Sequence, residues 1–125
     1  MDKIIENIYR MIVELASLSL QRKLWLNESN DTGLISSFYE LMNSLFDDFG
    51  FDDFIDNGVA KMGLSNSLII ELKKLRELLN SYAEKESDEE IINDPEWKKI
   101  VEQAKIVIKE WDDKGSPDIS EDWRV

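Results

Sequence analysis

The sequence predicts an all-α protein, and two observations support this prediction. Apolar residues recur at spacings of three and four along most of the 125 residues, which is the period of an amphipathic helix. No stretch alternates apolar and polar residues between hairpin turns, so no sheet is expected. We therefore expect a single helical domain, 1–125, built as a bundle of four main helices at roughly 2–26, 34–49, 66–84 and 95–113.

The first predicted helix begins at Asp2, whose side chain can cap it. It continues through Leu24 and Trp25 and ends at the run of turn-forming residues 27–33. This helix is expected to be central, because its apolar stripe is long. The expected stripe comprises Ile4, Ile5, Ile8, Met11, Ile12, Leu15, Ala16 and Leu18.

The second predicted helix begins near Leu34 and ends at Gly50, because glycine suits the left-handed residue just past a helix end. Residues 51–56 are expected to form a short helical turn or an ordered loop, and 57–63 a connection. The inward side chains of the second helix are expected to be Phe38, Leu41, Met42, Leu45 and Phe49.

The third predicted helix is capped by Ser65 and the fourth starts at Asp94-Pro95, an N-cap followed by proline at the first helical position. The acidic run 84–90 between them is expected to be a solvated loop. The inward side chains are Leu68, Leu72, Leu75, Leu79 and Tyr82 in the third helix, and Trp97, Ile100, Val101, Ala104, Val107, Ile108 and Trp111 in the fourth.

The fourth helix is expected to end at Lys114-Gly115-Ser116-Pro117, which supplies a basic last turn, a C-terminal glycine and a proline stop. The tail 115–125 is then either held to the body by Ile119 and Trp123 or mobile, as chain termini often are.

The composition excludes several classes of function. The chain has no cysteine and no histidine, which removes thiol catalysis, disulfides, the commonest general base and the commonest transition-metal ligand. The glycines of 58–65 have the spacing of a phosphate loop, but Leu64 stands where that loop needs lysine. The aspartates also break the alternating ligand pattern of a calcium loop. We therefore expect no enzyme, no cofactor and no metal site.

The charge of the chain points to a protein partner. Fifteen basic and 27 acidic residues give a formal net charge of −12, which repels nucleic acid and anionic lipid and attracts basic proteins. The start of the chain lacks the basic region and cleavage site of a secretory signal, and no apolar run is long enough to span a membrane. We expect a cytoplasmic monomer that binds a basic protein.

The most unusual stretch repeats Phe-Asp-Asp-Phe on both sides of Gly50, at 46–49 and 51–54. No Lys or Arg is adjacent to its aspartates, and carboxylates at the end of a helix are disfavoured by the helix dipole, so stability alone does not explain them. Two interpretations stay open: an ordinary core of phenylalanines with a solvated acidic face, or a binding surface. In the second, the partner-binding residues are Asp47, Asp48, Phe51, Asp52, Asp53 and Asp56.

A short, acidic, helical chain with such an acidic and aromatic stretch resembles the small immunity proteins that neutralise bacterial polymorphic toxins, especially those of contact-dependent growth inhibition. The tyrosine pair of the helical nuclease-colicin immunity proteins is absent from this sequence. The resemblance implies tight binding to one cognate toxin, often a basic nuclease, by covering its active site or a site beside it.

Two other classes of function fit the same sequence. An acidic helical regulatory or adaptor protein would bind another protein or a helix in a groove between its own helices. An acidic mimic of DNA would occupy a nucleic-acid-binding protein. A gene neighbour separates these classes, because an immunity gene should directly follow a toxin gene.

Overall fold

The computed structural model describes residues 3–58 and 63–114. Within these residues the chain forms seven α-helices and two π-helical segments, and no strand. The predicted all-α class is confirmed. The predicted count of four main helices is not, because the first expected helix is divided in two and two additional short helices form, at 51–53 and 88–92.

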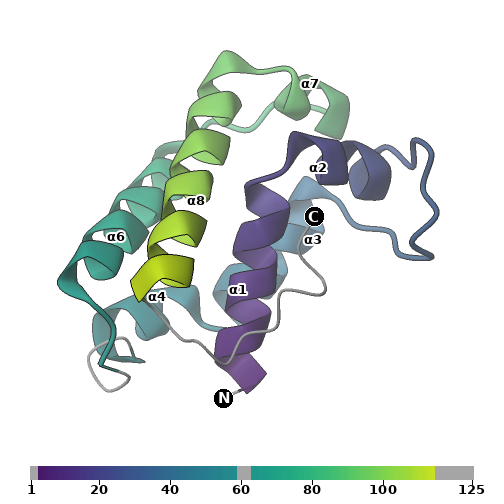
Figure 1. The fold of residues 1–125 in the computed structure, drawn as a ribbon. Helices are drawn as coiled ribbons and strands as arrows, with labels where there is room; N and C mark the ends of the chain where they lie inside the picture. Colours follow the sequence, from purple (N-terminus) through teal and green to yellow (C-terminus); the bar gives the residue numbers. More distant parts are fainter. Residues whose placement is uncertain (1–2, 59–62, 115–125) are drawn as a thin grey trace.

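Three helices make the main layer of the fold. The last and longest helix, α8 (Pro95–Lys114), lies between α6 (Asn66–Ser81) and α1 (Lys3–Leu15), as Figure 1 shows. Both neighbours run antiparallel to α8: the Gln103 side chain reaches Glu71 in α6, and the Tyr9 ring packs edge-on against Trp111, 5.1 Å away. The remaining short helices cover the ends and one side of this layer.

The predicted first helix is two helices. After α1 the chain turns at Ala16-Ser17, and α2 (Leu18–Trp25) begins with Ser17 as its N-cap, the Ser17 hydroxyl accepting a bond of 3.0 Å from the Leu20 amide. The buried side-chain amide of Gln21 donates to the carbonyls of Glu14 and Leu15 at the end of α1, and the Ser17 amide also donates to the Glu14 carbonyl. The break is therefore satisfied on both sides by side chains.

The buried face of α1 is also rotated relative to the prediction. Ile4 is 50% exposed and Met11 is half-buried, whereas Tyr9 and Val13 are buried. The buried apolar residues of α1 are Ile5, Ile8, Tyr9, Ile12, Val13 and Leu15. The predicted central position of the helix is consistent with this, since α1 contacts α2, α8 and the segment after α3.

The second predicted helix starts later and changes its winding. It begins at α3 (Phe38–Met42), where the Ser37 hydroxyl accepts from the Glu40 amide at 3.0 Å. It continues as a π-helical segment, η1 (Asn43–Asp48), which ends when the Phe49 amide donates to Ser44 O. Leu34 and Ile35 therefore lie in a loop, not in a helix.

Gly50 takes the left-handed conformation that was predicted for it, with φ of 61°. It separates η1 from a short helix, α4 (Phe51–Asp53), that runs into a second π-helical segment, η2 (Phe54–Gly58). The helical alternative expected for 51–56 is therefore the correct one.

The later helices follow the prediction closely. Ser65 caps α6 and the Asp94 carboxylate caps α8 through the Glu96 amide. The 84–90 run is more than a solvated loop, because Ser87 caps an additional short helix, α7 (Asp88–Ile92), that buries Ile91 and Ile92. The predicted cap Asp2, the stop at 115–117 and the tail 115–125 lie outside the described residues.

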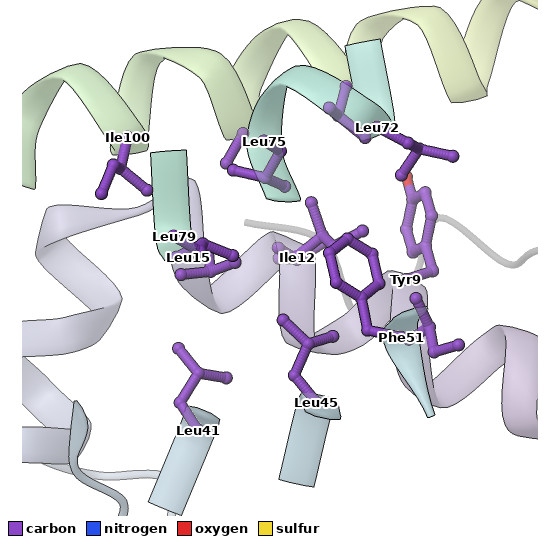
Figure 2. Close-up of a cluster of buried hydrophobic side chains, with 14 of the residues drawn as sticks. Tyr9, Ile12, Leu15, Leu41, Leu45, Phe51, Leu72, Leu75, Leu79 and Ile100 are labelled. Carbon is purple, nitrogen blue, oxygen red and sulfur yellow. The ribbon is translucent and has the colours of Figure 1, made fainter. Parts of the chain in front are cut away.

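The buried side chains of all these elements belong to one core. Figure 2 shows Tyr9, Ile12 and Leu15 of α1 facing Leu72, Leu75 and Leu79 of α6, with Leu41, Leu45 and Phe51 closing the other side. The three tryptophans predicted to be internal, Trp25, Trp97 and Trp111, are buried. This core supports the surfaces described next.

Candidate protein-binding surface

The five aspartates that the sequence singled out are all exposed in the structure. We call this group the acidic face: Asp47, Asp48, Asp52, Asp53 and Asp56. The first two end η1, the next two lie in α4 and the last lies in η2. The left-handed turn at Gly50 brings the two halves of the repeated motif into consecutive short helices.

The phenylalanines of the motif hold the acidic face to the core. Phe51 is 0% exposed and lies edge-on to Phe46, with ring centroids 5.5 Å apart, and Phe54 stacks on Trp111 at 5.9 Å. Phe51 was expected to touch the partner, and this expectation is wrong for the folded chain, because a side chain without exposed surface cannot be a contact residue. Its position makes it the support of the aspartates instead.

Part of the acidic face is balanced by a base that the local sequence does not reveal. Arg76 of α6 places Nη1 at 2.9 Å from Asp56 Oδ1 and at 3.5 Å from Asp52 Oδ1. The hydrogen bond to Asp56 raises the pKa of Arg76 above its ordinary value. The aspartates therefore have no basic neighbour in the sequence, but two of them have one in space.

The other three aspartates have no basic partner in the part of the chain that is described. Asp53 accepts a bond of 2.8 Å from the side-chain amide of Asn57, while no ion pair joins Asp47 or Asp48 to any residue within 3–58 and 63–114. Carboxylates in this arrangement can accept hydrogen bonds from Lys or Arg side chains of another protein.

The second acidic run, 84–90, lies elsewhere on the molecule. Two of its carboxylates form hydrogen bonds within the fold. Asp88 accepts from the Phe38 amide at 3.2 Å, and Glu90 accepts from the Ser87 hydroxyl at the start of α7. Glu84 and Glu86 remain exposed beside an open pocket of about 440 Å³ that Tyr39 also lines. This run is thus a secondary candidate for a charged contact.

The exposed apolar residues before α3 were not predicted. Leu34 and Ile35 were assigned to a helix start, whereas the pattern Ser37-x-x-Glu40, typical of a helix N-terminus, places that start at Phe38, four residues later. The signal was therefore present in the sequence. It leaves Leu34 and Ile35 in the preceding loop, where their side chains face solvent.

Two kinds of feature are absent from the described residues. Within them no group of three or more acidic side chains is placed to hold a metal ion. Nor does any helix of residues 3–58 and 63–114 have both the length and the apolar character needed to cross a bilayer. Comparisons of the chain with protein-family models, with curated proteins and with solved structures found no match.

Proposed function

We propose that this chain is a bacterial immunity protein that works in the cytoplasm and neutralises a basic, nuclease-type toxin. The acidic face would cover the active site of the toxin or a surface next to it. Such an inhibitor works by binding alone and needs no catalytic residue. The resemblance to immunity proteins is the reason for proposing a toxin as the partner, and the charge of the acidic face is the reason for proposing a basic one.

The observation that carries this proposal is the concentration of unbalanced charge. Between Lys23 and Lys61 the chain contains no Lys or Arg and eight acidic residues. These are Glu28, Asp31, Glu40 and the five aspartates of the acidic face. Among the described residues Arg76 forms ion pairs with this segment, and it reaches two of the eight. A field of one sign over a folded surface speeds the association of an oppositely charged partner.

The rigid base of the acidic face favours binding over an unspecific charged coat. Phe51, Phe54 and Ile55 are buried directly beneath the aspartates, so the backbone of α4 and η2 is fixed before a partner arrives. A preorganised surface loses little conformational entropy on association. Tight inhibition of one target needs this property.

The proposal is tested with the protein encoded by the gene directly before this one, purified as an inactive toxin domain. Wild type is compared with a variant carrying Asp47→Asn, Asp48→Asn and Asp53→Asn, none of which contacts Arg76. We expect the affinity for the toxin to fall more than about tenfold, or about 1.4 kcal/mol, with an unchanged melting temperature.

A matched control removes three exposed negative charges that lie outside the acidic face, on α6 and α8, with Glu77→Gln, Glu96→Gln and Glu102→Gln. This variant has the same net charge as the first, so its affinity should stay within about threefold of wild type. Equal affinities for the two triple variants would move the interface away from the acidic face. A gene neighbour that neither resembles a toxin nor binds the chain would overturn the immunity function itself and favour a regulatory or adaptor protein.

A further inference from the structure

The loop that joins α2 to α3 exposes large apolar side chains. Leu34 is 64% exposed and Ile35 is 80% exposed, and Tyr39, in the first turn of α3, is 69% exposed. Tyr39 follows Ile35 by four positions, a span of at most about 14 Å along an extended chain. One partner surface of ordinary size, about 800 Å², can contact all three side chains. We call these three residues the apolar anchor.

The loop is held in one conformation by its own side chains. The Asn30 amide donates to the Leu34 carbonyl at 2.6 Å, and its oxygen accepts from both the amide and the hydroxyl of Thr32. The Thr32 hydroxyl in turn accepts from the Leu34 amide at 3.0 Å. Beyond the turn, the Ser36 amide donates to Leu24 O and returns the chain to α2. Leu34 and Ile35 are thus presented by an ordered turn.

The chain accepts an energetic cost to form this loop. Ser29 has a positive φ of 49°, a region that costs about 1 kcal/mol or more for a residue of this type, whereas Asn27, with φ of 57°, is the left-handed residue just past the end of α2 that asparagine commonly supplies. Two adjacent aliphatic side chains then remain in water although the core lies only a few residues away in the sequence. Packing within the chain does not explain the exposure of these two side chains, whereas a surface preformed for a partner does.

The surroundings of the apolar anchor define the charge of that partner. Glu28, Asp31 and Glu40 are exposed on the same segment, which has no basic residue, and Glu84 and Glu86 line the pocket next to Tyr39 together with Lys85. A second copy of this acidic chain, or an anionic membrane, would be repelled. Apolar side chains within an acidic rim fit a basic surface that contains an apolar pocket.

We infer that the apolar anchor is a second protein-docking surface, which inserts Leu34, Ile35 and Tyr39 into an apolar pocket of a basic protein. It is separate from the acidic face: the loop after α2 projects from one side of the molecule and α4 lies at the opposite side (Figure 1). The inference does not require the partner to be a toxin. It assigns the apolar centre of a contact to exposed side chains that the acidic face lacks, since Phe51 and Phe54 there are buried and the other two phenylalanines of the motif are half-buried.

The test uses a phage-displayed library of random peptides as the probe, selected on the full chain. Peptides that also bind the variant Leu34→Ser with Ile35→Ser are removed by counter-selection. We expect the remaining peptides to place Lys or Arg on both sides of an apolar residue. Each synthetic peptide should bind wild type at least about 30-fold more tightly than the variant, the loss typical of central contact residues.

Two controls make the result specific. Ile70→Ser with Ile106→Ser removes two exposed isoleucines from α6 and α8, and this variant should bind the peptides like wild type. The triple variant of the acidic face, Asp47→Asn, Asp48→Asn and Asp53→Asn, should bind them within about threefold of wild type. Melting temperatures of all variants should agree, because every changed side chain is exposed.

Several outcomes would overturn the inference. One is that no peptide distinguishes wild type from the Leu34 and Ile35 variant, and another is that the selected peptides carry no basic residue. Loss of peptide binding only in the acidic-face variant would assign docking to that face and support the proposed function instead. A wild-type dimer in sedimentation that the Leu34 and Ile35 variant dissociates would identify a second copy as the occupant.

Discussion

The indole nitrogen of Trp97 donates a hydrogen bond of 2.9 Å to the side-chain oxygen of Gln21, and both residues are fully buried. The amide of Gln21 also donates to the carbonyls of Glu14 and Leu15, each at 3.0 Å. A single glutamine therefore joins the end of α1, the body of α2 and the start of α8. It satisfies all of its partners in a region closed to water.

Replacing this glutamine should destabilise the fold strongly. In Gln21→Ala the Trp97 nitrogen and two carbonyls lose their buried partner, and we expect the free energy of unfolding to fall by at least about 2 kcal/mol in urea melts. Gln103→Ala is the matched control, because Gln103 is half-buried and its amide donates to Glu71 near the surface. Its cost should stay below about 1 kcal/mol. Equal losses in the two variants would show that the buried hydrogen bonds of Gln21 contribute no more to stability than the half-buried ones of Gln103.

Glu14 should make stability depend on pH. Burial raises the pKa of this carboxyl above its ordinary value of 4.5, although hydrogen bonds from Trp25 and Ser36 lower it in part. The folded chain then holds this proton more tightly than the unfolded chain. The free energy of unfolding should therefore decrease as the pH rises from the ordinary pKa through the raised one, and the loss is complete above it.

The substitution Glu14→Gln tests this dependence, because glutamine keeps the shape and can still accept from Trp25. We expect the variant to be more stable than wild type at about pH 8 and to lose the advantage at about pH 4, where the glutamate of wild type is protonated. Urea melts at both pH values measure the difference. The exposed Glu102→Gln should show no such change, and an equal response of the two variants would contradict a special role for Glu14.

The two phenylalanines that flank Gly50 should differ in their importance. Phe51→Ala removes a side chain with no exposed surface and should cost about 3 to 5 kcal/mol, whereas Phe49→Ala, at a half-buried position, should cost clearly less. Thermal or urea unfolding of the two variants gives the comparison. A mild effect at Phe51 together with lost partner binding would return it to the role of a contact residue.

The sequence was sufficient to predict the features that local chemistry decides. The apolar period gave α6 and α8 with their buried faces, Ser65 and Asp94-Pro95 marked their starts, and Gly50 marked a left-handed turn. The break at Ser17 was missed because the apolar period of α1 runs on into α2 without a glycine or proline. The Ser17 cap is local, but the contacts of Gln21 with the end of α1 and with the distant Trp97 arise only in the folded chain.

The candidate binding surface was likewise predicted only where it depends on local sequence. The exposure of the five aspartates follows from their type, but the pairing of Asp52 and Asp56 with Arg76 depends on how α6 packs against η2, which no local pattern encodes. The burial of Phe51 likewise depends on space that α1 leaves beside Leu45 (Figure 2). No sequence pattern predicts the π-helical winding of η1, so the direction in which Asp47 and Asp48 point could not be predicted from the sequence.

Arg76 offers a test of the acidic face that strengthens binding instead of weakening it. In Arg76→Gln the carboxylates of Asp52 and Asp56 lose their basic partner and become available to the toxin. Both aspartates are more than half exposed, so the change in stability should remain below about 1 kcal/mol. If the acidic face meets a basic toxin, the association rate should rise, and the gain should vanish at high salt because screening removes the added attraction. Stopped-flow binding at several salt concentrations measures both effects.

Lys74→Gln, on the same helix and with the same change in net charge, should give a smaller increase, because Lys74 pairs with Glu71 away from the acidic face. Equal rates in the two variants would reduce the effect to net charge, and slower association in Arg76→Gln would mean that the partner recognises the arranged pair instead of the freed aspartates.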